Sequence, residues 1–422
     1  MNGDRHGTVN AGCYYPRVNL SRWLWIPVIL GTSFPIASVR ALQTAQAPTA
    51  TSASATVRVI EPPATRLPEE PASVRVTRFS FVAYGDTRSG SDPNVPGDGR
   101  VIQAEHSRLV DRVIAKSREL ASTPFPIRFV LQSGDAVLRG TDAAMWNISF
   151  NPIIERLTRS ANLPYFFTVG NHDVPGEGGR TQGLQNTLTA MSKLIPAEGS
   201  PRRLKGYPTY AFGYGNSFFI ALDSNIAGDA FQLAWVTDQL EHLDRARFRH
   251  VIAFFHHGIF SSGPHGGGSA DPVPGTGRKA PDRPEPQTVS LRSLYMPLFR
   301  KHHVRMLIAG HDHLFDHWVE RYSSGGSTYR MDTLVTGGGG APIYTYVGEP
   351  DLRPYIAAGA PENVRVEHLM KPGSTQEENP HHFVVVQVDG DKLSVEVVGS
   401  GATQYKPYGG TRSKLELWDR AS

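Results

Sequence analysis

The chain has 422 residues and a formal net charge of +4, and its length allows one large domain or two of ordinary size. Hydrophobic residues make up 39% and charged residues 19%, which is typical of a soluble globular protein, while 42 glycines and 32 prolines argue against a helical bundle. Without residues 1–47 the chain would be near neutral, which gives no support for a nucleic-acid-binding surface.

The first segment resembles a secretory signal peptide. Arginines precede an apolar run over residues 23–36, and a small-x-small cleavage site follows at residues 45–47. A membrane anchor is the weaker alternative, because the run is shorter than the ~20 residues that a span needs and contains two prolines. We therefore expect residues 1–47 to be a signal peptide and the mature protein to be exported, periplasmic or secreted, with no stable membrane span.

The rest of the chain divides by composition. Residues 48–74 are rich in Ala, Thr, Ser and Pro, which predicts a linker. We expect one folded domain over residues 75–400 and a C-terminal tail over residues 401–422.

Short apolar runs alternate with helix-like segments in the expected domain. The runs predicted as buried strands are residues 79–84, 127–132, 165–169, 251–255 and 306–309. Amphipathic helices are predicted over residues 105–120, 231–243 and 289–302, and hairpins over residues 210–223 and 382–398. This order favours an α/β fold of layered sheets with helices outside.

Each predicted strand runs into a polar cluster. In chain order the clusters are Gly85-Asp86-Thr87-Arg88, Gly134-Asp135, Gly170-Asn171-His172-Asp173, His256-His257 and Gly310-His311-Asp312-His313. Any one of them is common in turns, but loops at strand ends meet at one crevice in layered folds, so we expect a single site. Carboxylate and amide oxygens with imidazole nitrogens suit divalent metals such as Zn, Mn or Fe.

With these motifs, the sequence from about Phe79 to Val398 resembles the calcineurin-like metallophosphoesterases, and within them the purple-acid-phosphatase-like branch. Ser261-Ser262-Gly263, His265-Gly266 and the run Gly337 to Gly340 also look like that branch. The resemblance implies a four-layer α/β/β/α sandwich, of class α/β (α+β), in which helices flank two mixed β-sheets. It also implies two divalent metal ions, with Fe, Mn and Zn as the possible metals.

The resemblance also implies a role for each motif residue. Asp135 would bridge the two metals. The other metal ligands would be Asp86 and His313 for the first metal, and Asn171, His256 and His311 for the second. His172 would act on the substrate, and Asp173 would orient its imidazole.

Two departures from the family pattern concern the first metal. Arg88 stands where many relatives have a histidine ligand, and Leu138 stands where purple acid phosphatases have a tyrosinate ligand. An arginine does not ligate a metal, but its fork suits a phosphate oxygen. We predict that His106, at the start of the helix over residues 105–120, replaces the missing ligand, with a water ligand as the alternative.

The expected function is metal-dependent hydrolysis of small phosphate esters. A metal-bound hydroxide would attack phosphorus, His172 would protonate the leaving oxygen, and Arg88 would stabilise the charged phosphoryl oxygens. Two alternatives stay open: a phosphodiesterase using the same site, and a non-catalytic envelope binding protein with a degraded first metal site. No nucleic-acid partner is expected.

Overall fold

A computed structural model describes residues 56–89, 101–176, 178–266, 284–401 and 404–417. These residues belong to one compact unit that begins at Ala53. The predicted signal peptide, residues 1–47, lies outside the described residues. Among the described helices, none has both the length and the apolar character that crossing a bilayer requires.

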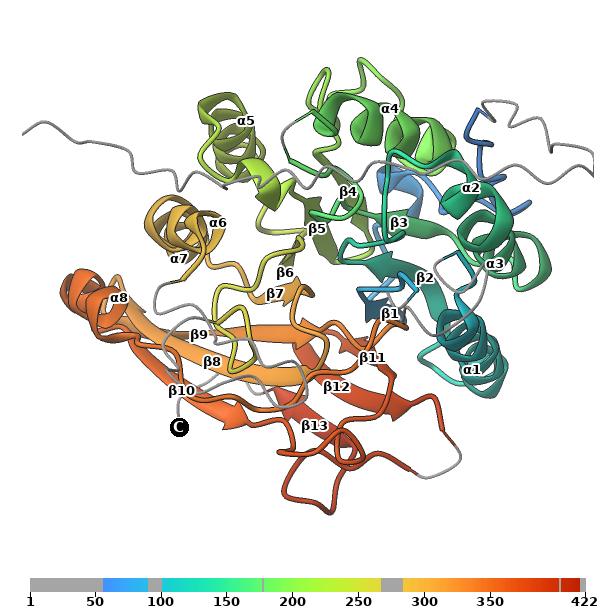
Figure 1. Ribbon diagram of the computed structural model, residues 1–422. Coiled ribbons are helices and arrows are strands. Elements are labelled where there is room, and N and C mark those ends of the chain that lie inside the picture. Colours follow the sequence, from blue (N-terminus) through green and yellow to red (C-terminus); the bar gives the residue numbers. More distant parts are fainter. Residues whose placement is uncertain (1–55, 90–100, 177, 267–283, 402–403, 418–422) are drawn as a thin grey trace, which may run out of the picture. The chain divides into compact units, whose positions relative to one another are not determined.

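The first sheet has six strands in the order β13-β12-β11-β1-β2-β3 (Figure 1). Its parallel pairs are β1 with β2 and β2 with β3, and its other pairs are antiparallel. The strands are β1 (Arg78–Tyr84), β2 (Ile127–Gln132), β3 (Tyr165–Phe167), β11 (His382–Asp389), β12 (Lys392–Gly399) and β13 (Lys414–Leu417). The predicted hairpin over residues 382–398 is confirmed as β11 and β12.

The second sheet has seven strands in the order β10-β8-β9-β7-β6-β5-β4. Strands β5, β6, β7 and β9 run parallel, whereas β4, β8 and β10 pair antiparallel with their neighbours. The strands are β4 (Tyr210–Tyr214), β5 (Ser217–Ala221), β6 (His250–Phe254), β7 (Met306–Ala309), β8 (Phe315–Ser324), β9 (Ser327–Thr336) and β10 (Arg365–Met370). The hairpin predicted over residues 210–223 is β4 and β5.

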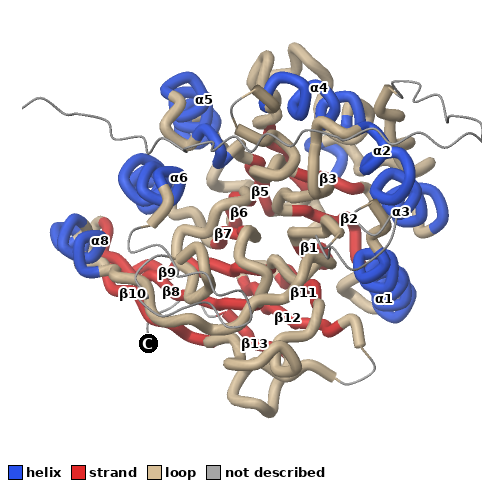
Figure 2. Tube along the Cα trace, in the orientation of Figure 1, coloured by secondary structure: helices blue, strands red, loops and turns tan. Residues whose placement is uncertain are grey.

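Helices lie on the outer sides of the two sheets (Figure 2). They are α1 (Ala104–Leu120), α2 (Ala143–Met145), α3 (Asn151–Glu155), α4 (Arg180–Met191), α5 (Ala230–Glu241), α6 (Pro286–Ser290), α7 (Met296–Lys301) and α8 (Arg353–Ala358). Wider, π-helical turns join α2 to α3 and α6 to α7. The predicted class, two mixed β-sheets flanked by helices, is therefore confirmed.

Strand β6 explains how the second sheet is buried on both faces. Ile252 and Phe254 pack into the core between the two sheets, whereas Val251 and Ala253 belong to the second core cluster, which includes side chains of α5 and α7. Successive side chains of a strand point to opposite faces, so a continuous apolar run is what a doubly covered strand requires. Between the sheets, the rings of Phe81 and Phe219 meet edge to face at 5.2 Å.

The domain boundaries differ from those expected. In the predicted linker, Val57 and Ile60 are buried, and the amide of Ile60 donates to the carbonyl of Ala190 at 2.9 Å. In the predicted tail, β13 adds a strand to the first sheet and buries Leu417. A low share of apolar residues is compatible with folded structure when those few side chains enter a core that other segments build.

Backbone hydrogen bonds continue just beyond the strand ends and hold the polar clusters together. The amide of Asp86 donates to the carbonyl of Gly134 at 2.9 Å, and that of Gly310 donates to the carbonyl of His256 at 3.0 Å. The amide of Gly85 donates to Thr336 at the end of β9, at 2.8 Å, which links the two sheets. The predicted clusters thus share one edge of the two-sheet core.

Candidate metal centre

Four donor atoms from four different loops meet at this edge. The Nε2 atom of His256 lies 2.9 Å from Asn171 Oδ1, 3.1 Å from His311 Nδ1 and 3.4 Å from Asp135 Oδ1. We call Asp135, Asn171, His256 and His311 the four-donor group. Three of the four side chains are buried, and Asn171 is partly exposed.

The hydrogen bonds of the two imidazoles fix where their protons lie. The Nδ1 atom of His256 is 3.0 Å from the carbonyl oxygen of Ser133, and the Nε2 atom of His311 is 2.9 Å from a carboxylate oxygen of Glu285. Both oxygens only accept, so each of these nitrogens donates and the other ring nitrogen presents a lone pair. Burial lowers the pKa of His256 to about 4 and that of His311 to about 3, which keeps both rings neutral at neutral pH.

The four-donor group therefore turns four lone pairs toward one another without a hydrogen between them. Such an arrangement is repulsive unless a cation lies among the donors. For metal–ligand bonds of about 2.1 Å, neighbouring donors of a tetrahedral or octahedral site lie roughly 3.0 to 3.4 Å apart. The separations described above fall close to this range, and two nitrogens with two oxygens suit Zn, Mn or Fe. The residues present fit one divalent ion.

The predicted first metal site differs from the four-donor group because an arginine lies among its donor atoms. The Oδ1 atom of Asp86 lies 3.5 Å from His313 Nε2, and His313 donates from Nδ1 to the carbonyl of Pro342 at 2.7 Å. The guanidinium of Arg88 lies in the same place, with Nη2 3.4 Å from His313 Nε2 and Nε 3.4 Å from Asp135 Oδ2. Arg88 is only 9% exposed. We call Asp86, Arg88, Asp135 and His313 the arginine subsite, and with Arg88 in this position it does not fit a second ion.

The structure does not bring His106, the predicted replacement ligand, to the metal centre. Its ring is fully buried, with Nδ1 2.8 Å from Gln103 Oε1 and Nε2 3.3 Å from the hydroxyl of Tyr84. It also stacks on Phe150, and burial lowers its pKa to about 3. His106 lies on the apolar face of α1 with Leu109 and Val110, which turns it into the core.

His172 lies beside the four-donor group with its side chain 31% exposed. Its Nδ1 donates to the carbonyl of Leu138 at 2.8 Å, and its Nε2 lies 3.9 Å from Asp135 Oδ2. The carbonyl of Leu138 thus sets the orientation of the ring, and Nε2 is the nitrogen that faces the site.

Asp173 corrects the predicted pairing, because it does not orient His172. Its two carboxylate oxygens accept from the backbone amides of Gly170 at 2.9 Å and Val137 at 3.2 Å. Burial, with the nearby charge of Asp135, raises the pKa of Asp173 to about 8. Asp173 holds together the two loops that carry Asp135 and His172.

Three predicted metal ligands have a backbone conformation that is unfavourable for them. The φ angles of Asp86, Asp135 and His311 are 59°, 56° and 71°, in the left-handed region that costs roughly 1–2 kcal/mol per residue. The loops also need close approach: a Cβ atom on Gly170 would lie 2.1 Å from Asp135 Oδ1, and one on Gly310 would lie 2.2 Å from Asp86 Oδ2. Strain of this kind concentrates at functional sites.

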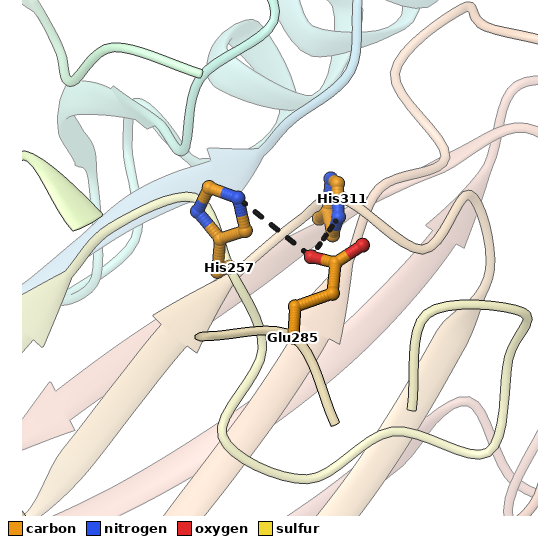
Figure 3. A group of neighbouring side chains, drawn as sticks. All are labelled: His257, Glu285 and His311. Carbon is orange, nitrogen blue, oxygen red and sulfur yellow. Dashed lines mark hydrogen bonds and ion pairs between the residues drawn. The ribbon is translucent and has the colours of Figure 1, made fainter. Parts of the chain in front are cut away.

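Glu285, just before α6, is a site residue that the sequence did not indicate. Figure 3 shows it facing His311 and His257, with its Oε2 atom 2.9 Å and 3.8 Å from the respective Nε2 atoms. Its other oxygen is 2.9 Å from His265 Nδ1. Burial opposes its ionisation, but the hydrogen bonds with His265 and His311 outweigh burial and hold the pKa of Glu285 well below its usual range. The Nδ1 atom of His257 lies 2.9 Å from the hydroxyl of Ser224.

Comparison with known proteins agrees with this architecture. The sequence profile of the family described as calcineurin-like phosphoesterase matches residues 105–315. Among solved structures, purple acid phosphatase PPD1 from yellow lupin (Lupinus luteus) seeds aligns with a TM-score of 0.53 and 17% identity, over 81% of this chain and 54% of that chain. The chain thus spans about half the length of that phosphatase.

A second solved structure, GAP50, the anchor in the inner membrane complex of Plasmodium, aligns with a TM-score of 0.47 and 13% identity, over 82% of this chain and 90% of that chain. No curated protein sequence matches significantly.

Proposed function

The chain belongs to the calcineurin-like phosphoesterase family, and from this premise we propose that it is a metal-dependent hydrolase of small phosphate esters. The observation that carries the proposal is the four-donor group, in which Asp135, Asn171 and His311 each place an acceptor atom 2.9 to 3.4 Å from His256 Nε2. Hydrolysis of a phosphate ester needs positive charge near the phosphoryl oxygens, and this group is built to hold it.

A divalent ion bound there would supply Lewis-acid charge and make a water more acidic. The protein's own groups have separate tasks. Arg88 holds a fixed positive charge beside Asp135, where it adds to the field acting on an anionic substrate. Glu285 and the Ser133 carbonyl keep the two imidazoles in the tautomers that a cation requires.

His172 is the proposed proton donor to the leaving oxygen. Its side chain is partly exposed, and the Leu138 carbonyl occupies its Nδ1 proton, so that Nε2 is left to exchange a proton with a substrate. His172 lies outside the four-donor group, which supports a role in proton transfer rather than in holding the ion.

The test is hydrolysis of p-nitrophenyl esters, measured as release of p-nitrophenol, by the full chain loaded separately with Mn, Zn and Fe(II). We expect hydrolysis that a chelator abolishes, with His256→Ala inactive and His242→Ala unchanged. His242 is a matched control because it caps α5 and its side chain is 77% exposed. Comparing p-nitrophenyl phosphate with its bis ester separates a phosphomonoesterase from the alternative phosphodiesterase. Metal binding without release of p-nitrophenol from either ester would contradict hydrolysis and favour the binding-protein alternative.

Export is a further proposal, supported by the apolar run and small-x-small site before residue 48. Expression of the full chain in a bacterial host should give a processed protein in the periplasm or medium, with a new N-terminus near Pro48. Recovery of the unprocessed chain in the cytoplasm would contradict it.

A further inference from the structure

We propose that the guanidinium of Arg88 takes the place of a second metal ion, so that the chain works with one divalent ion. This inference rests on the proposed function. It departs from the two ions that the family resemblance implies, and it concerns the arginine subsite alone.

The contacts of Arg88 put its charge among the donors of that subsite. Its Nη2 atom is 3.4 Å from the lone-pair nitrogen of His313, and its Nε atom is 3.4 Å from the carboxylate of Asp135. The Oδ1 atom of Asp86 has no hydrogen-bond partner among the described residues, although it faces the same space. A fixed cation thus lies among the same kinds of donors that would hold an ion.

The backbone gives Arg88 little freedom to leave. Its amide donates to the carbonyl of Asp135 at 3.1 Å, and the preceding amide, of Thr87, donates to the same oxygen at 3.0 Å. The hydroxyl of Thr87 donates to the carbonyl of Ala136 at 3.0 Å. These bonds tie the loop of Arg88 to the loop of Asp135, and the side chain is almost completely buried. Release of the guanidinium would require solvating it elsewhere and leaving two carboxylates without it.

Charge also favours one ion. The guanidinium of Arg88 already places one positive charge beside the buried carboxylate of Asp135. A second divalent ion beside Arg88 would place like charges in contact at low dielectric, which is strongly unfavourable. The other donors of the subsite are the types that metals use, so Arg88 is the group that keeps an ion out.

This arrangement predicts that one substitution restores a second site. Arg88→His removes the guanidinium and adds an imidazole beside Asp86, Asp135 and His313. Arg88→Lys keeps a positive charge and is the matched control. The probe is the metal alone: each protein is loaded with Mn and desalted, its bound metal is measured by elemental analysis, and its spectrum is recorded by electron paramagnetic resonance.

We expect one equivalent of Mn in the wild type and in Arg88→Lys, with the spectrum of an isolated ion. Arg88→His should bind two equivalents and give the spectrum of a coupled pair, since paired ions in such sites lie about 3.5–4 Å apart. His313→Ala should keep one equivalent in the wild-type background. Circular dichroism checks that each variant is folded, and Arg88→Ala, which should gain a weaker second site, replaces Arg88→His if the latter does not fold.

Two equivalents in an active wild type would overturn this inference and leave the proposed function intact. One equivalent in both wild type and folded Arg88→His would also overturn it, because Arg88 would not then be the group that excludes the ion. No bound ion in folded wild type would refute the proposed function and the inference together.

Discussion

Two buried clusters both contain aspartate and histidine, and they differ in where their protons lie. One is the four-donor group at the ends of the parallel strands. The other, which we call the closed cluster, consists of Arg305, His317, Arg330, Asp332 and Tyr408. In the closed cluster, Asp332 accepts from Arg305 at 2.8 Å, from His317 at 2.9 Å and from Arg330 at 2.6 Å, and the second ring nitrogen of His317 lies 2.9 Å from the Tyr408 hydroxyl.

In the closed cluster, the polar atoms of Asp332 and His317 therefore have protein partners. Each contact pairs a donor with an acceptor, and two arginines balance the carboxylate. In the four-donor group, by contrast, His256, His311 and Asn171 present acceptors to one another. Buried histidine and aspartate are thus no sign of a metal site by themselves. The sign is a set of lone pairs that face one another with no proton of the protein between them.

The largest effect should follow loss of the carboxylate in the four-donor group. Asp135→Asn keeps the size of the side chain and removes its charge. Metal affinity and activity should both fall by more than the roughly 10- to 100-fold that follows loss of a residue hydrogen-bonded to a metal ligand. Elemental analysis and phosphate release measure both. The matched change, Asp332→Asn, should leave metal content unchanged in the folded protein. Full metal content in Asp135→Asn would contradict the assignment of the four-donor group, as opposed to the closed cluster, as the metal site.

His172→Ala should lower turnover by about 10²- to 10⁴-fold, the usual contribution of a general acid, while metal content stays unchanged. The loss should be large for an alkyl phosphate and smaller for p-nitrophenyl phosphate, whose leaving group needs less protonation. A series of esters with leaving groups of different pKa measures this slope. An equal loss for all esters, or a parallel loss of metal, would argue against proton transfer by His172.

The closed cluster should contribute to stability rather than to activity. Asp332→Asn leaves Arg305 and Arg330 without their shared carboxylate and should destabilise the fold by about 3–5 kcal/mol, as does breaking other buried ion pairs. Chemical denaturation measures the free energy of unfolding. A change near zero would mean that water or another group replaces the carboxylate.

Glu285→Gln should weaken metal binding by about 10- to 100-fold, because the carboxylate fixes the proton of His311 on Nε2. Metal titration of the apoprotein gives the affinity. Thr237→Ala on the outer layer, whose hydroxyl donates to the carbonyl of Leu233 within α5, is a control that should leave the affinity unchanged. Unchanged affinity in Glu285→Gln would show that the ring keeps its tautomer without the carboxylate.

The smallest expected effect is a change in the stability of the fold at acidic pH. Burial opposes ionisation of Asp332, but His317, Arg305 and Arg330 outweigh it and hold its pKa below the usual value of about 3.9. A lowered folded-state pKa stabilises the protein above the unfolded pKa, and this contribution is lost as the pH falls toward the folded value. The stability difference between wild type and Asp332→Asn should therefore be smaller at pH 3 than at pH 5. Equal differences would exclude this linkage.

Much of the fold could be predicted because its signals are local. The apolar runs at 127–132 and 306–309 coincide with β2 and β7, since a strand covered on both faces needs continuous apolar residues. The hairpin of β8 and β9 was not predicted, because its sequence interrupts the apolar residues with polar and charged ones and so lacks that signal. Strand β13 was missed because its pairing partner, β12, provides what its own four residues do not indicate.

The sequence by itself determined the types and order of the donors at the strand ends, because each donor directly follows its strand. Only the tertiary structure decided which lone pairs remain free. That outcome depends on the Leu138 carbonyl, on Glu285 and on the positions of Arg88 and His106, which are contacts between segments distant in the chain. A residue's type fixes the bonds it can make, and its neighbours in space fix which of those bonds are already made.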